Sequence, residues 1–279
     1  MSNDNQKTRS ANEYHLINAD GHYTEPGDLF TSRVEKQFLD RVPRMEYIPE
    51  QKGDGWILDG VASPISFGMN ACAGLPPAEQ TSWCRFEDIR AGGYDPQARL
   101  NEMDADSVDA EVLYPTPRLS MAMFAQKDPA LHLAMVRAWN DWMAEYVAYA
   151  PDRFAGIPVI PNHGPEMACA EIDRMLGKPA IRGFLMGCYA NGTMAPAPED
   201  DAVYARLVEA GLPLNIHVAM TNVMPGVHKS TLPGWGRFFD APNRMVQMIF
   251  AGIFDRFPEL QVVFAETDCG WVPYVMEQV

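Results

Sequence analysis

The sequence predicts an α/β domain built on a parallel sheet. Three observations support this prediction: short apolar runs alternate with helical segments, the runs are largely continuous, and the links between them are short except for one long insertion. Continuous apolar runs are typical of parallel strands, because both faces of such strands are buried. Strands that alternate with helices over short connections favour right-handed βαβ units.

Six segments are predicted as strands. They are residues 15–20, 110–116, 154–161, 181–187, 212–219 and 260–267. Residues 31–94 form a long insertion between the first two strands, and its Asp59-Gly60 pair predicts a tight hairpin turn. A long segment that leaves the carboxyl end of a strand often covers an active site.

The helices begin and end at recognisable residues. Asp95 and Asp128 are each followed by proline, which suits an N-cap and a first helical turn. Pro151 ends the second of these helices, and Gly211 follows the helix over 198–210. Residues 242–257 are predicted as one further helix, because apolar side chains recur there at helical spacing up to Pro258.

Charge and composition exclude several classes of protein. The 279 residues are 47% hydrophobic and carry a formal net charge of -15, which argues against binding to nucleic acid or to an anionic membrane surface. No apolar run approaches the roughly 20 residues that span a bilayer. The polar residues 1–13 are expected to be a disordered tail, and five scattered cysteines favour a reduced, cytoplasmic compartment.

Two potential metal ligands lie at the end of the first strand. Asp20 and His22 are two residues apart, so they share one face of a strand. His217 lies near the end of the fifth strand, where a barrel or an open α/β sheet places its ligands. One carboxylate and two imidazoles suit zinc, and also manganese or iron. Taken singly, His217 also fits a buried histidine bonded to a backbone carbonyl.

Glu266 and Asp268 lie at the end of the sixth predicted strand. Glu266 is the candidate for general acid or base work, because burial and a nearby ion would shift its pKa. Asp268 is predicted to cap the following helix turn. His163 also follows a strand, but its sequence "PNHGP" is typical of a turn.

Five ordered blocks resemble the amidohydrolase-related family, which includes aminocarboxymuconate-semialdehyde decarboxylase and γ-resorcylate decarboxylase. The blocks are "DGHYTEPGDLF", "RLNEMDADSVDAEVLYPT", "AWNDWMAEYVAYAPDRFAGIPVIP", "GLPLNIHV" and "IFDRFPELQVVFAETDCGWVPYVME". The resemblance implies a (β/α)8 TIM-barrel with one divalent metal, held here by Asp20, His22 and His217. Many members carry a catalytic histidine where this chain has Glu266.

The resemblance also implies strands that this chain lacks. Family members continue to a seventh strand and to an eighth that bears an aspartate ligand, so about six of the eight strands are expected here. We therefore expect residues 14–279 to form a C-terminally incomplete barrel domain.

These observations predict a non-oxidative decarboxylase of a small aromatic or ring-cleavage carboxylate, with zinc as its first-choice metal and Glu266 as its proton-transfer residue. A metal-dependent hydrolase of a C–O, C–N or C–C bond is the first alternative. A truncated, non-catalytic chain is the second. The expected partner is a small carboxylate substrate, with neither nucleic acid nor membrane, and a homodimer is compatible with the resemblance.

Overall fold

The computed structural model describes residues 14–224 and 240–279. The predicted tail over residues 1–13 lies outside the described residues. The strands are β1 (Ile17–His22), β2 (Arg44–Ile48), β3 (Gly53–Ile57), β4 (Ala110–Tyr114), β5 (Phe154–Gly156), β6 (Phe184–Leu185), β7 (Leu214–His217) and β8 (Val262–Ala265). The helices are α1 (Pro96–Ala105), α2 (Pro117–Ala125), α3 (Pro129–Val147), α4 (Pro165–Met175), α5 (Asp201–Ala210), α6 (Asp240–Phe250), α7 (Ile253–Arg256) and α8 (Trp271–Gln278).

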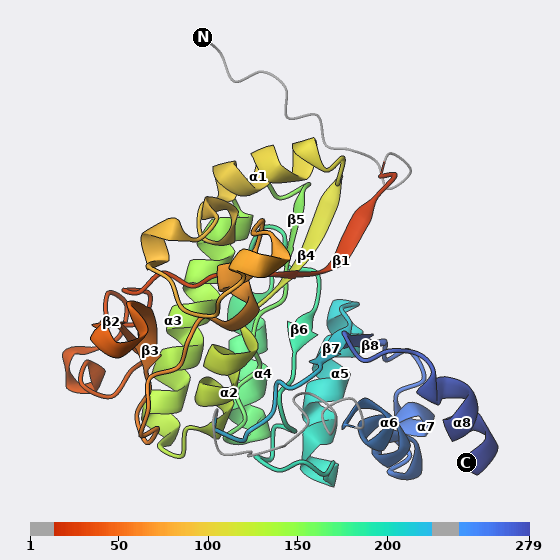
Figure 1. Ribbon diagram of the computed structural model, residues 1–279. Coiled ribbons are helices and arrows are strands. Elements are labelled where there is room, and N and C mark those ends of the chain that lie inside the picture. Colours follow the sequence, from red (N-terminus) through yellow and green to blue (C-terminus); the bar gives the residue numbers. More distant parts are fainter. Residues whose placement is uncertain (1–13, 225–239) are drawn as a thin grey trace.

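Six parallel strands follow one another in the order β1-β4-β5 and β6-β7-β8. Isolated parallel bridges from Gly156 to Ile181 and from Val159 to Leu185 join the two groups. Each predicted strand segment overlaps one of these strands, although β1 ends two residues beyond the predicted end at residue 20, so the parallel α/β prediction is confirmed. Within the described residues the strands form an open arc, and β1 and β8 are its two edges (Figure 1).

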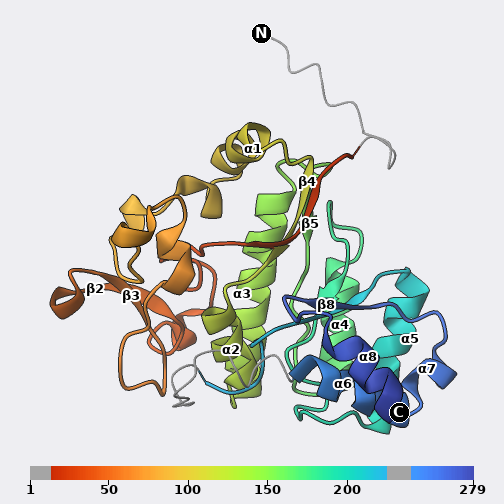
Figure 2. The same ribbon diagram turned by 45° about the vertical axis from the view of Figure 1, so that its right-hand side comes forward.

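The insertion lies on the opposite side of the molecule from the C-terminal helices (Figures 1 and 2). Its antiparallel hairpin pairs β2 with β3, and the turn between them ends at Lys52 in a left-handed conformation. The turn predicted at Asp59-Gly60 lies after β3 and leads to a further antiparallel bridge between Trp56 and Ile65.

Helix α3 contributes much of the core. The carboxylate of Asp128 accepts from the backbone amides of Ala130 and Leu131, which confirms the predicted N-cap and first turn. The α3 residues buried to 2% exposure or less include Leu131, Met135, Val136, Trp139, Met143 and Val147. Burial of this face holds the helix against β5, where Met143 and Val147 contact Gly156 at the carboxyl end of that strand.

One predicted helix is divided in the structure. Residues 242–257 were expected to be continuous, but Gly252 adopts a left-handed φ of 64° between α6 and α7. The predicted apolar stripe is correspondingly interrupted, since Met248 and Ile253 are buried whereas Ile249 is 37% exposed. Glycine adopts this conformation without the steric cost that a Cβ would impose.

Candidate metal centre

Four predicted side chains converge at the carboxyl ends of three strands. Asp20 and His22 belong to β1, His217 is the last residue of β7, and Glu266 directly follows β8. One ligand atom from each of the four can be chosen so that all lie within 4.8 Å of one another. Parallel strands end at the same edge, so residues 197 positions apart, such as Asp20 and His217, meet there.

The distances between these groups are those of a coordination shell. Asp20 Oδ1 is 3.1 Å from His217 Nε2 and 3.6 Å from His22 Nε2. Glu266 Oε2 is 3.6 Å from His217 Nε2. Ligand atoms about 2.0–2.2 Å from one zinc ion are separated from each other by about 3–4 Å. The three measured separations therefore lie in the range expected around one divalent ion, which makes the cluster a candidate metal site.

Backbone carbonyls orient both imidazole rings. His22 Nδ1 lies 2.9 Å from the Pro115 carbonyl, and His217 Nδ1 lies 2.8 Å from the Val218 carbonyl. A proton on each Nδ1 leaves Nε2 as a lone-pair donor, which is the usual arrangement of a metal-ligating histidine. At His217 the Nε2 atom also faces the Asp20 carboxylate. A neutral imidazole has one N–H, so His217 cannot donate to both the Val218 carbonyl and the Asp20 carboxylate. A cation between Nε2 and the Asp20 carboxylate would satisfy both of these groups.

The charges of the cluster shift its pKa values in opposite directions. Burial opposes ionisation of Asp20, but its hydrogen bond with His217 and the two imidazoles hold its pKa below the usual range. Burial raises the pKa of Glu266, and Asp20 adds to this effect while His217 opposes it. Burial and the neighbouring His217 lower the pKa of His22, which favours its neutral, metal-binding form.

Strained backbone follows the two C-terminal strands of the cluster. Ala219 and Glu266 have φ values of 62° and 53°, although neither is glycine. Such conformations cost about 1–3 kcal/mol each and concentrate at functional sites. At Glu266 this conformation brings a half-exposed carboxylate, 52% accessible, beside the fully buried His217.

Several other candidates lie outside the cluster. Asp268 accepts hydrogen bonds from the amides of Cys269 and Gly270, which precede α8, so it stabilises a local turn; the predicted helix cap is wrong, because the N-cap of α8 is Gly270 and no side chain caps it. His163 Nε2 contacts the Gln126 carbonyl, and its ring packs on His132. Within residues 14–224 and 240–279, no second group of three potential ligands converges in this way.

One neighbour of the cluster was not predicted. The ring of Tyr114, at the end of β4, lies 5.1 Å from that of His217 and 6.4 Å from that of His22. Its hydroxyl donates to Asn215 Oδ1 at 2.9 Å. In the sequence Tyr114 ends an apolar run and gives no signal that separates it from a core aromatic residue.

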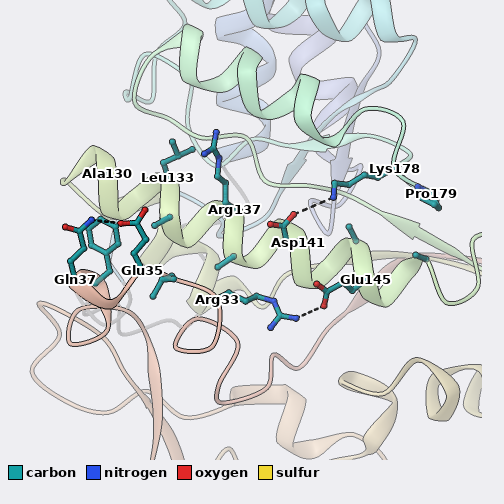
Figure 3. Close-up of a pocket in the computed structure, with 16 residues that line it drawn as sticks. Arg33, Glu35, Gln37, Ala130, Leu133, Arg137, Asp141, Glu145, Lys178 and Pro179 are labelled. Atoms are coloured by element: carbon teal, nitrogen blue, oxygen red, sulfur yellow. Dashed lines mark hydrogen bonds and ion pairs between the residues drawn. The ribbon is translucent and has the colours of Figure 1, made fainter.

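Two hollows differ in their relation to the cluster. A cavity of about 330 Å³ beside β1 is lined by Asp20, His22, Arg90 and Arg99 among others, so it gives access to two of the ligands. A larger groove of about 870 Å³ lies on the outer side of α3, and none of the four cluster residues lines it (Figure 3). Its charged side chains pair with one another, as Arg33 does with Glu145. The smaller cavity reaches only the β1 part of the cluster, because neither His217 nor Glu266 lines it.

The chain is similar to known proteins over most of its length. The family model described as "Amidohydrolase" matches residues 21–277. The 2-amino-3-carboxymuconate-6-semialdehyde decarboxylase of Dictyostelium discoideum is 28% identical over 197 residues, which are 70% of this chain and 53% of that protein. The chain spans about half the length of the curated relatives it matches.

Solved structures have a similar fold. The amidohydrolase map2389c from Mycobacterium avium subsp. paratuberculosis superposes with a TM-score of 0.70 at 23% identity, covering 95% of this chain and 75% of that one. The 5-carboxyvanillate decarboxylase of Novosphingobium aromaticivorans, complexed with manganese and 4-hydroxy-3-methoxy-5-nitrobenzoic acid, gives 0.62 at 20% identity, covering 98% and 72%. These TM-scores establish a common fold, of the TIM-barrel type.

Proposed function

Because the chain belongs to the amidohydrolase family, we propose that it is a metal-dependent enzyme that releases CO2 from a small aromatic or ring-cleavage carboxylate. The observation that carries this proposal is the convergence of Asp20, His22, His217 and Glu266 at one edge of the parallel strands. The relative named as a decarboxylase supports this choice of reaction.

Asp20, His22 and His217 would hold one divalent ion. One carboxylate and two imidazoles suit zinc first, with manganese or iron as alternatives. A bound ion would supply positive charge to the carboxylate and the neighbouring oxygen of the substrate. The Nδ1 contacts to Pro115 and Val218 fix both rings, so the site is arranged before substrate enters.

Glu266 is the proposed proton-transfer residue. Decarboxylation breaks the bond between a substrate carbon and its carboxylate, and that carbon then gains a proton in place of CO2. Glu266 Oε2 lies 3.6 Å from His217 Nε2, so this carboxyl group is beside the proposed ion, where it could deliver that proton. Its half-exposed position leaves room for a substrate carbon to approach.

Hydrolysis is the second candidate function. The amidohydrolase from Mycobacterium avium has the highest TM-score of the two structures described above. In that case Glu266 would accept a proton from an attacking water, and a C–O, C–N or C–C bond would break. The same four side chains would serve both reactions.

The two reactions differ in their products. The metal-loaded chain would be incubated with hydroxylated benzoates, ring-cleavage carboxylates and aromatic lactones, while released CO2 and titratable acid are measured together. We expect CO2 release that disappears in Glu266→Gln and His217→Ala. Acid release without CO2 would instead support the hydrolase. Failure of both in the parent would contradict catalysis by this chain.

We also propose a cytoplasmic location for the protein. All five cysteines are free, which agrees with a reducing, cytoplasmic location. Among the described residues, no helix is long and apolar enough to cross a membrane. A homodimer stays a prediction.

A further inference from the structure

Strand β1 contains one extra residue beside the candidate ligands. Asn18 pairs with Glu111 of β4, but Gly21 pairs with Leu113. Three steps along β1 therefore match two steps along β4. This is a β-bulge at residues 19–20, a feature that often lies next to active sites, where it redirects a side chain.

The bulge determines which way Asp20 points. Asn18 bonds to Glu111, and the Gly21 backbone faces Arg99 of α1, so both lie on the helix-covered side of the strand. Asp20 and His22 lie on the other side, where they meet His217. In a regular strand Asn18 and Asp20 would share one face. The extra residue therefore places Asn18 and the candidate ligand Asp20 on opposite faces of β1.

A chain of polar side chains, with Glu111 buried and Asn18 and Arg99 partly buried, holds this arrangement. Asn18 Oδ1 accepts from the amide of Asp20 at 3.1 Å, and its Nδ2 donates to Glu111 Oε1 at 2.9 Å. Arg99 donates from Nε to Glu111 Oε2 at 2.5 Å and from Nη1 to the His22 carbonyl at 3.1 Å. This series of hydrogen bonds thus links the backbone amide of Asp20 to the backbone carbonyl of His22.

Its burial explains why three polar groups occur together here. Glu111 is 6% exposed and the Arg99 side chain is 14% exposed. A charge this deeply buried requires both a partner and hydrogen bonds. Glu111 has both, since each of its carboxylate oxygens accepts one donor. The sequence contained a signal for it, because Glu111 is the only charged residue in the run "AEVLY".

We propose that Asn18, Glu111 and Arg99 are positioning residues that lock the bulge and thereby set the metal-binding geometry of Asp20 and His22. This inference rests on the proposed metal site. None of the three side chains belongs to the ligand cluster, so they act through the backbone of β1. Residues that orient ligands in this way typically alter metal affinity by about 10–100-fold when they are replaced.

The test compares one disruptive and one compensated exchange. Asn18→Asp sets two carboxylates against each other and removes the donor to Glu111. The double variant Asn18→Asp/Glu111→Gln exchanges the acid and the amide, so that one donor still faces one acceptor. It also keeps the net charge of the parent. Asn18→Ala removes both contacts.

Each variant would be titrated with Zn²⁺ and Mn²⁺ by calorimetry, and Co²⁺ absorption would report the coordination geometry. We expect metal binding to weaken about 10–100-fold in Asn18→Asp and Asn18→Ala, with an altered Co²⁺ spectrum, and to recover in the double variant. The melting temperature of the metal-free proteins would show whether the fold is kept. If Asn18→Ala fails to fold, the single and double Asp variants still decide.

The outcomes are distinguishable. A parent that binds metal and an Asn18→Asp variant that binds it equally well would overturn this inference alone. Weaker binding that the double variant does not restore would also overturn it. A parent that binds no metal would overturn the proposed function, and this inference with it.

Discussion

The carboxyl group of Glu25 offers a quantitative test of the hydrogen bonds that join the segment after β1 to helices α2 and α3. Glu25 follows β1 and is 1% exposed. Its Oε1 accepts from the Thr116 amide at 3.0 Å and from Trp139 Nε1 at 3.1 Å, while Oε2 accepts from the Thr116 hydroxyl at 2.9 Å. It therefore joins the segment after β1 to the start of α2 and to the middle of α3.

The expected cost of Glu25→Ala follows from the donors it leaves behind. Two N–H groups, of Thr116 and Trp139, lose their acceptor, whereas the hydroxyl can rotate. Each buried unpaired donor costs about 1–3 kcal/mol, so the free energy of unfolding should fall by about 2–6 kcal/mol. That is a large part of the roughly 5–15 kcal/mol that stabilises most domains.

Glu25→Gln is the matched control. Its oxygen can still accept from both N–H groups, and its amide can donate to the Thr116 hydroxyl, so we expect a loss of no more than about 1 kcal/mol. Burial raises the pKa of Glu25, so its contribution to stability is complete at low pH and decreases as the pH rises through the folded-state pKa. Glu25→Gln should therefore flatten the decline of stability across the weakly acidic range.

Urea unfolding followed by tryptophan fluorescence would measure both variants. A Glu25→Ala protein as stable as the parent would refute the reasoning, because two buried donors would then have cost nothing. A Glu25→Gln protein as unstable as Glu25→Ala would show that the carboxylate charge, and not the hydrogen bonds, holds these segments.

Three further predictions concern other parts of the molecule. Tyr114→Phe should lower the free energy of unfolding by about 1–2 kcal/mol in a urea titration, because Asn215 Oδ1 loses the hydroxyl donor; an unchanged midpoint would contradict this. Gly211→Ala should cost about 1 kcal/mol by the same measurement, since Gly211 ends α5 at a φ of 64°, and a stabilised variant would contradict the left-handed cap. Glu266→Gln should retain calorimetric metal binding while it loses CO2 release, whereas loss of the metal would identify Glu266 as a ligand instead.

The sequence predicted the parts of the fold that depend on local chemistry. Helix α3 was predicted because Asp128 and Pro129 mark its start and Pro151 limits its end. The break at Gly252 was not predicted, because the apolar spacing continues through it. Helix α2 was also missed: nearly all of its side chains are buried, so it has no polar face to reveal a helical period.

The candidate site likewise has residues that the sequence predicted and a feature that it could not predict. Asp20, His22, His217 and Glu266 could be predicted because each lies at the end of an apolar run, and ends of parallel strands meet. Their roles as ligands and as a proton-transfer residue stay predictions. The bulge in β1 could not be predicted, because it is a property of the register between β1 and β4, which are far apart in the sequence.

The central claim is that this chain assembles a metal site from β1 and β7. Elemental analysis of the purified 279-residue protein, beside its His217→Ala variant, tests that claim most directly. We predict one equivalent of zinc, manganese or iron in the parent and its loss in the variant. Equal metal content in both proteins, or none in the parent, would contradict the account.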